Sequence, residues 1–363
     1  MIPAQLYIYI YTIIIGIVAM SYYGVLTQKS ANGLLNKSIG SNSFIVILYI
    51  IVALFIGFRP ISGIFTDMLL YSSMYYDNIM TDHNDIGIWW LASFCKSWNL
   101  ESSVWFTIIS FIYFGAYLKA SMNLSKNNGG LFFVTFLIAF STFAYATNTI
   151  RCGMATSIAI LAMSYYLLNA KSSKIIAYIL FVCSIITHKS SALPIACFII
   201  SYYKVDAKKS MLFWLLSVVL SLVMGNSISS MFENIGFDDR MDKYLQATDM
   251  TGFAYVGFRW DFLLYSIMPI LLAYYIIIKK KIRDKKYETL ISAYILSNAF
   301  WVMIIRAQFS DRFAYLSWFM YPIVIAYPFL KLDIFGTMQA KIAKRVFFAH
   351  LGFTLFMVFV FYA

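Results

Sequence analysis

Apolar residues in this chain gather in long runs, separated by short segments rich in charged residues, glycine, asparagine and serine. A helix that crosses a bilayer needs about 20 predominantly apolar residues. The pattern therefore predicts an all-α polytopic integral membrane protein with about twelve spanning helices. The predicted spans lie near residues 6–26, 43–58, 100–118, 130–149, 152–169, 174–188, 191–203, 211–229, 260–278, 289–305, 313–330 and 346–362.

Composition supports this assignment and limits the domain organisation. Hydrophobic residues make up 61% of the 363 residues and charged residues 12%, which is about half the charged fraction of a soluble protein. We therefore expect one transmembrane domain, residues 1–363, with no soluble domain attached. Two longer segments, 59–99 and 230–259, fall outside the spans. Within the first, Ile86 to Trp98 is predicted to form an amphipathic interfacial helix.

The distribution of lysine gives the orientation of the predicted spans. Of the 20 lysines, 17 fall in one set of connecting segments, and an excess of lysine and arginine marks the cytoplasmic side. Both termini are then predicted on the outer, periplasmic side. Because this bias accounts for most of the net charge of +12, we expect no nucleic-acid partner.

The arginines are distributed differently from the lysines. Six of the eight fall on the predicted outer side, where topology does not require positive charge: Arg59, Arg151, Arg240, Arg259, Arg306 and Arg312. A planar guanidinium with five donors suits phosphate, whereas a lysine ammonium is a strongly hydrated point charge. The outer arginines therefore indicate an anionic ligand at that face.

Two of these arginines stand in distinctive local sequences. Asn148-Thr149-Ile150-Arg151 joins two predicted spans almost without a loop, which holds Arg151 at the outer membrane boundary. A charge there is retained for a partner or a ligand, and a salt bridge between helices is the alternative. Arg59 ends the second span beside Pro60, and Asp67 is expected to orient it through a bidentate pair; snorkelling to the interface is its alternative.

The remaining candidates lie at other outer turns. His188, in Thr187-His188-Lys189-Ser190-Ser191, can serve as a general base or donate to phosphate, and a packing role is equally compatible with the sequence. Arg259 and Asp261 flank Trp260, and Asp311 and Arg312 start another span. Arg240 lies among three aspartates that either bind a divalent cation or form a solvated loop, and Arg306 is either a site residue or a loop charge.

Taken in order, these segments resemble the EpsG/Wzy-type polysaccharide polymerases. The resemblance covers about residues 55 to 315 and rests on short motifs: GFRP with Asp67 and Tyr71 after it, NTIR, THKSSA, FRWDF and SDRF. It puts weight on Arg59, Asp67, Asn148, Arg151, His188, Arg259, Asp261, Asp311 and Arg312. Where the family often has glutamine after the NTIR arginine, this chain has Cys152.

The resemblance implies an inner-membrane enzyme with a GT-C-like helical fold and a periplasmic active site. Such enzymes join undecaprenyl-pyrophosphate-linked oligosaccharides, which serve as donor and acceptor, and extend O-antigen, capsule or exopolysaccharide. A chain-length regulator is a further partner that the resemblance suggests. No cofactor or metal is expected, because guanidinium groups can neutralise the pyrophosphate.

Apart from the resemblance, the side-chain chemistry of the candidate residues suits transfer of a glycan from a pyrophosphate. Arg59, Arg151 and Arg312 are expected to stabilise the departing pyrophosphate. His188, Asp67 or Asp311 is expected to take the proton of the acceptor hydroxyl. Three other classes share some of these features: a lipid-linked oligosaccharide flippase, an O-antigen ligase and a membrane acyltransferase. The clustering of cationic candidates at one face disfavours the flippase, and the modest length of the outer segments disfavours the ligase.

Overall fold

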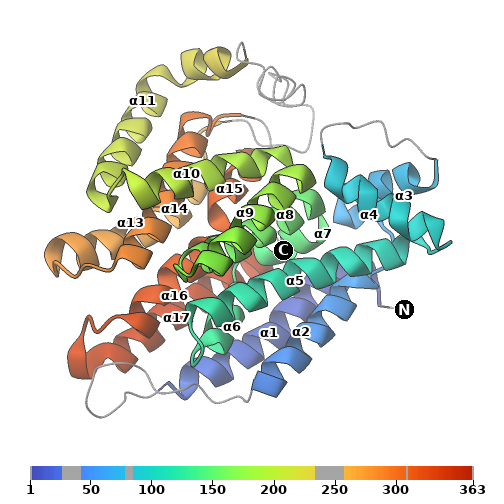
Figure 1. Ribbon diagram of the computed structural model, residues 1–363, viewed down its shortest axis with the longest axis horizontal. Coiled ribbons are helices and arrows are strands. Elements are labelled where there is room, and N and C mark those ends of the chain that lie inside the picture. The colour runs from blue at the N-terminus through green and yellow to red at the C-terminus, as the bar shows by residue number, and fades with distance from the viewer. Residues whose placement is uncertain (1, 27–41, 78–84, 234–256, 308–309, 362–363) are drawn as a thin grey trace. The chain divides into compact units, whose positions relative to one another are not determined.

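The computed structural model describes residues 2–26, 42–77, 85–233, 257–307 and 310–361 (Figure 1). Within these ranges, every predicted apolar run falls on helical structure. The helices are α1 (Tyr7–Gly24), α2 (Asn42–Gly57), α3 (Met68–Tyr76), α4 (Ile86–Ser97), α5 (Ser102–Leu124), α6 (Gly129–Leu137), α7 (Thr142–Thr147), α8 (Ile150–Tyr166), α9 (Lys171–Thr187), α10 (Ala192–Tyr203), α11 (Ala207–Glu233), α13 (Trp260–Ala273), α14 (Lys285–Met303), α15 (Ser310–Trp318), α16 (Tyr321–Lys331) and α17 (Gln339–Phe356).

Several of these helices are long and apolar enough to cross a membrane. Among the described residues, six qualify by length and composition: Ala4–Gly24, Ser102–Leu124, Ala207–Met224, Trp260–Lys279, Ser310–Lys331 and Gly336–Phe361. Large apolar side chains stay exposed on α1, α9 and α11, as expected of helices whose outer face meets lipid. The chain is thus a helical membrane protein. The total of about twelve spans and the periplasmic termini stay predictions.

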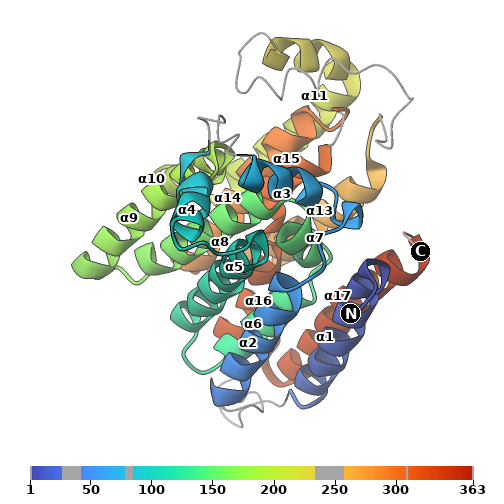
Figure 2. The same ribbon diagram turned by 90° about the vertical axis from the view of Figure 1, so that its right-hand side faces the viewer.

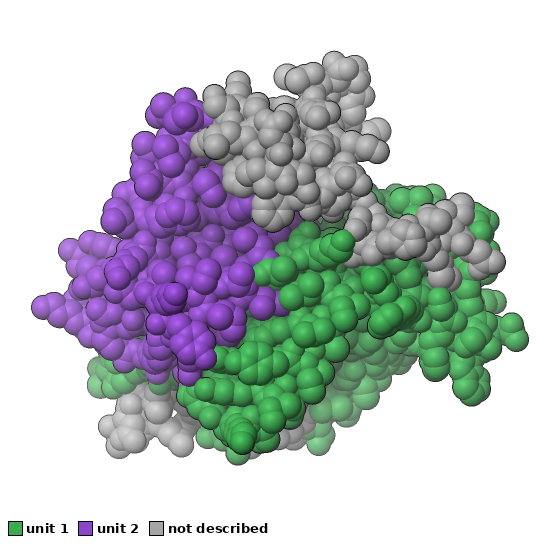
Figure 3. Space-filling view, turned by 45° about the horizontal axis from the view of Figure 1, so that its top comes forward, with its two compact units in different colours: residues 1–192, 325–363 green, residues 193–324 purple. Residues whose placement is uncertain are grey.

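The chain divides into two compact units, which Figure 3 colours separately. Unit 1 comprises residues 1–192 and 325–363, and unit 2 comprises residues 193–324. In unit 1, α5 packs against α2, α6 and α8, while α1 packs against α17 (Figure 2). In unit 2, α14 packs against α11, α13 and α15.

Helix α8 lies at the centre of unit 1, between α5 and α9. Its buried positions include the small residues Gly153, Ala155, Ala159 and Ala162. Small residues let neighbouring helix backbones approach closely, and this close packing drives helix association in a membrane, where the hydrophobic effect contributes little. Gly153 illustrates how tight this packing is. A Cβ added there would lie 3.1 Å from the carbonyl carbon of Tyr145, and closer still to its oxygen.

Two predicted spans are interrupted in the structure. The 130–149 run is divided into α6 and α7, where the Thr142 hydroxyl donates to the Phe136 carbonyl at 2.6 Å and so satisfies backbone at the bend. The 313–330 run is divided into α15 and α16. Pro322, the second residue of α16, suits the first turn of a new helix because its missing N–H would have no helical partner there.

Several polar side chains buried in unit 2 pair with one another. The indole Nε1 of Trp214 donates to Asn298 Oδ1 at 2.8 Å, and Asn298 Nδ2 donates to the Ser317 hydroxyl at 3.0 Å. Trp318 Nε1 donates to the Ser266 hydroxyl at 2.8 Å. Because an unpaired polar group in an apolar medium costs several kcal/mol, these pairs determine how α11, α13, α14 and α15 align.

The predicted amphipathic helix in segment 59–99 is present as α4. One face, with Trp89, Ala92 and Cys95, is buried. On the opposite face, Trp90 is 65% exposed and Trp98 is 68% exposed. Tryptophan is enriched where membrane meets water, so α4 has the composition of a helix at that boundary. Its interfacial location stays a prediction. Most of segment 230–259 lies outside the described residues.

We predict that Gly153→Ala destabilises the protein by about 1–3 kcal/mol, because the new methyl group forces α7 and α8 apart. The matched control is Gly352→Ala on α17, where an added Cβ meets nothing within 4 Å. That variant should be as stable as the parent or slightly more so. Thermal unfolding in detergent measures both, and equal melting temperatures for the two variants would contradict the packing described for α8.

We predict that a green fluorescent reporter fused after Lys209 is fluorescent and that one fused at the C-terminus is dark. The reporter folds in the cytoplasm but not after export through the general secretory pathway, and lysine-rich segments stay on the cytoplasmic side. Whole-cell fluorescence, normalised to the amount of fusion protein on immunoblots, measures the difference. Bright C-terminal fusions would place that end in the cytoplasm.

Candidate functional site

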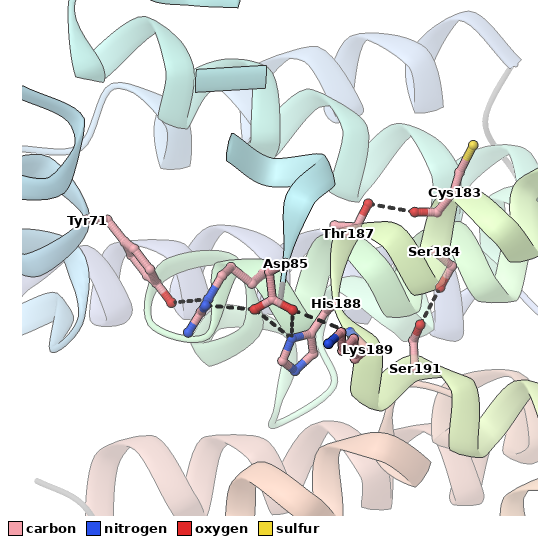
Figure 4. A network of polar contacts seen from close by, with 9 residues as sticks. Tyr71, Asp85, Cys183, Ser184, Thr187, His188, Lys189 and Ser191 are labelled. Carbon is pink, nitrogen blue, oxygen red and sulfur yellow. Dashed lines mark hydrogen bonds and ion pairs between the residues drawn. The ribbon is translucent and has the colours of Figure 1, made fainter. Parts of the chain in front are cut away.

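A buried carboxylate, Asp85, collects three donors in unit 1. Its side chain is 5% exposed, and it immediately precedes α4. Arg151 Nη1 donates to Oδ2 at 2.7 Å. His188 Nδ1 lies 3.1 Å from Oδ1 and 3.2 Å from Oδ2, and the backbone N–H of Lys189 donates to Oδ1 at 3.4 Å. Figure 4 shows Asp85 and His188 pointing toward one another, with Lys189 beside them.

Three helices that are distant in sequence bring these groups together. Asp85 stands at the start of α4, Arg151 in the first turn of α8, and His188 directly after α9. Helix α9 packs against both α4 and α8. A cation in the first turn of a helix is opposed by the helix dipole, so Arg151 needs a nearby anion, and Asp85 provides it.

Arg151 has a second partner on another side. Its Nε donates to the Tyr71 hydroxyl at 2.8 Å, and its guanidinium lies 5.3 Å from the centre of the Tyr71 ring. Burial lowers the pKa of Arg151, but the nearby Tyr71, Asp85 and Asp67 outweigh this effect and raise it. The side chain keeps 13% of its surface exposed.

The Asp85 carboxylate is held in its ionised form. Burial raises the pKa of Asp85, but the hydrogen bond from His188 and the charges of His188 and Arg151 together lower it below its ordinary value. Because the folded pKa is depressed, this network stabilises the fold above the ordinary pKa of an aspartate, about 3.9. The stabilisation is lost as the pH falls through the folded pKa.

Arg59 occupies a different position from the one predicted. It is 2% exposed and lies between the rings of Phe65 and Phe106, 5.4 Å from each centre. Its Nη1 donates to the Ile56 carbonyl at 2.8 Å and its Nη2 to the Thr147 carbonyl at 3.1 Å. The expected bidentate pair with Asp67 is therefore wrong: the guanidinium binds the carboxyl ends of α2 and α7, where a cation is favourable.

This placement makes Arg59 a support for the turn that carries Arg151. Burial lowers the pKa of Arg59 to about 9, so the side chain remains protonated at neutral pH. Thr147, whose carbonyl it holds, is the last residue of α7, and its hydroxyl donates to Asn148 Oδ1 at 3.1 Å. Asn148 is half-buried in the turn between α7 and α8.

A second charged group lies in unit 2. Arg259 Nε donates to Asp261 Oδ1 at 2.9 Å and Arg259 Nη2 to Asp261 Oδ2 at 2.6 Å, a bidentate pair. The guanidinium lies 3.5 Å from the centre of the Phe262 ring. The positive charges of Arg312 and Arg259 attract the Asp311 carboxylate electrostatically. Arg306 lies 5.7 Å from the centre of the Phe258 ring.

The predicted site residues thus form two groups, one in each unit. Unit 1 holds Arg59, Asp67, Asn148, Arg151 and His188, and unit 2 holds Arg259, Asp261, Arg306, Asp311 and Arg312. Arg240 lies outside the described residues.

The sequence did not single out Asp85, the centre of the unit 1 group. It follows several similar acidic and polar positions, and only its place directly before a predicted amphipathic helix distinguishes it. Tyr71 lies within one of the sequence motifs, but that motif does not indicate Arg151 as its partner. Both contacts join residues 66 or more positions apart, which local spacing does not reveal.

Comparison with known proteins agrees with the motif pattern. A model of the EpsG family matches residues 42–363, which is most of the chain. The chain belongs to the EpsG family. This is a family of glycosyltransferase-like proteins of the polysaccharide-polymerase type. No curated protein and no solved structure matches the chain significantly. The EpsG match includes all of the predicted site residues.

We predict that Arg59→Lys lowers both thermal stability and activity, because one ammonium group cannot reach the Ile56 and Thr147 carbonyls together. Leaving one buried carbonyl without a donor costs about 1–3 kcal/mol. Thermal unfolding in detergent, without substrate, measures the effect. A variant of unchanged stability that loses only substrate affinity would instead show that Arg59 contacts the ligand directly.

Proposed function

We propose that this EpsG-family protein is an O-antigen or exopolysaccharide polymerase of the bacterial inner membrane. It transfers the growing glycan from undecaprenyl pyrophosphate to the next lipid-linked repeat unit at the periplasmic face. The observation that carries this proposal is the partly exposed pair of Arg151 and His188 held on one buried carboxylate. A cation and a potential base are thereby fixed within reach of one ligand.

The reaction requires one bond to form and one to break. A hydroxyl oxygen of the acceptor sugar attacks the anomeric carbon of the donor glycan, and the bond from that carbon to the pyrophosphate oxygen breaks. The bonding electrons leave with the pyrophosphate. The hydroxyl proton passes to a base. The products are a glycan longer by one transfer, attached to the acceptor lipid, and undecaprenyl pyrophosphate.

Arginine side chains supply the electrostatic part of this reaction. Pyrophosphate is a good leaving group once its developing charge is stabilised, and donors already in place in a poorly hydrated site provide that stabilisation. Arg151 is held on two sides, by Tyr71 and Asp85, so it needs little reorganisation. In unit 2, Arg312 and Arg259 are the corresponding candidates, with Asp261 and Asp311 orienting them.

His188 is our choice for the base. Its side chain is 19% exposed, whereas Asp85 is buried and already accepts hydrogen bonds from several donors. Imidazole is the side chain best suited to exchange a proton near neutral pH. Asp67 and Asp311 are the other candidates from the sequence, and Asp67 acts electrostatically on Arg151.

We predict that Arg151→Ala and Arg312→Ala each reduce polymer formation by about 10²-fold or more, the loss that follows removal of one transition-state donor. Arg151→Lys should fail as well, because an ammonium cannot bind both Tyr71 and Asp85 in the same fork geometry. The matched control is Arg283→Ala, which removes a half-exposed arginine paired with Glu288 on the predicted cytoplasmic side.

The assay uses purified protein with a lipid-linked repeat unit, and the product is resolved as a ladder of glycans. A ladder from the parent and from Arg283→Ala, with single-repeat material alone from the other variants, supports the proposal. Full polymer from both alanine variants would remove the role of arginine at the pyrophosphate. Translocation of the lipid-linked unit across vesicles without lengthening would instead indicate a flippase.

A further inference from the structure

We propose that Asp85 is a positioning residue that keeps a proton on Nδ1 of His188, so that Nε2 is the ring nitrogen presented to the substrate. The catalytic consequence rests on the proposed polymerase function, but the protonation pattern itself does not. No motif of the family resemblance includes Asp85, and the role follows from contacts between helices that are far apart in the sequence.

The first argument is the direction of the hydrogen bonds around the carboxylate. Arg151 Nη1 and the Lys189 backbone N–H can only donate, and both donate to Asp85. A carboxylate surrounded by donors is ionised and can only accept. His188 Nδ1 lies within 3.1–3.2 Å of both oxygens, so this nitrogen must carry a hydrogen whether the ring is neutral or charged.

The second argument concerns the other ring nitrogen. Among the described residues, the imidazole of His188 forms its hydrogen bonds through Nδ1. With Nδ1 protonated, Nε2 of the neutral ring has a lone pair and accepts a proton. Once it has done so, the same nitrogen is a donor. A single orientation therefore allows His188 to take the acceptor hydroxyl proton at Nε2 and later to release it from the same nitrogen.

The third argument is that the backbone near Asp85 allows the start of α4 to lie close to the end of α9. Gly87, in the first turn of α4, lies so close to Thr187 that an added Cβ would be 3.2 Å from the Thr187 Cα, N and Oγ1 atoms. Thr187 directly precedes His188. The absence of a side chain at Gly87 thus lets the start of α4 meet the end of α9, which brings Asp85 to the imidazole.

Asp85 also fixes the distance between base and cation. Because one carboxylate binds both Arg151 and His188, the guanidinium and the imidazole are held at neighbouring positions. A base that acts on the acceptor hydroxyl and a cation that acts on the leaving group must be separated by about the width of the reacting centre, and misplacement of about 1 Å can cost 10²-fold in rate. Asp85 sets this spacing without contacting the substrate.

The decisive experiment is nitrogen-15 NMR of the full-length protein labelled at histidine. The chain has three histidines, His83, His188 and His350, so the His188 signals are assigned by their loss in His188→Gln. At a pH where the ring is neutral, we expect a protonated Nδ1 and an unprotonated, pyridine-type Nε2. A protonated Nε2 with an unprotonated Nδ1 would overturn the proposal, whatever the activity of the protein.

Two variants connect the protonation pattern to catalysis. Asp85→Asn should lose the fixed Nδ1–H form and reduce kcat for chain extension by about 10²-fold or more, the usual contribution of a general base, with a much smaller change in KM. Arg151→Lys, in contrast, should keep the Nδ1–H form while polymer is lost. A normal kcat, or an unchanged nitrogen spectrum, in Asp85→Asn would overturn the positioning role.

Gly87→Ala tests the same role without removing a polar group, in case Asp85→Asn fails to fold. The added methyl group should move Asp85 from His188 and lower kcat, whereas Gly352→Ala should leave both kcat and the nitrogen spectrum unchanged. Gly87→Ala with parental kcat and spectrum would count against the proposal. If the parent yields no glycan ladder but shows the predicted spectrum, the polymerase function fails and the Asp85–His188 arrangement stands.

Discussion

The negative charge of a carboxylate buried in a membrane protein must be balanced by nearby positive groups and hydrogen-bond donors. The packing of α4, α8 and α9 in unit 1 follows from how Asp85 meets this requirement. An isolated buried charge is very costly, whereas a charge that is paired and hydrogen-bonded is tolerated. Asp85 is paired by Arg151 and His188 from two other helices. Removing any one of the three leaves a buried or half-buried charge with too few partners. The pairing therefore constrains α4, α8 and α9 jointly.

Most helices and most charged candidates could be predicted from the sequence, because both depend on local pattern. The apolar runs required no knowledge of tertiary contacts, and Arg151 and His188 stood out because tight turns restrict where they can lie. Asp85 could not be found in this way, since its importance depends on contacts with residues 66 and 103 positions away. For the same reason the predicted pair of Arg59 with Asp67 was wrong. Arg59 binds the Thr147 carbonyl, a backbone group that no sequence pattern distinguishes from other carbonyls.

The two kinds of basic residue have different physical roles. Lysines in the connecting segments are predicted to act through their number and sidedness, by orienting the chain in the membrane. The arginines act individually. Arg59 binds two helix ends in a buried aromatic environment, whereas Arg259 is paired with Asp261 and lies against Phe262. A guanidinium suits these settings because it is more weakly hydrated than an ammonium and has donors in fixed directions.

The order in which the chain is made gives the Asp85 network a further property. Asp85 leaves the ribosome first, then Arg151, and His188 last, and their separations of 66 and 103 residues place whole helices between them. Asp85 is therefore without its first partner until α5 to α7 have been synthesised. A chain that ended after α5 would lack both partners of the Asp85 carboxylate, so α4 can reach its final packing only once α8 and α9 have been made.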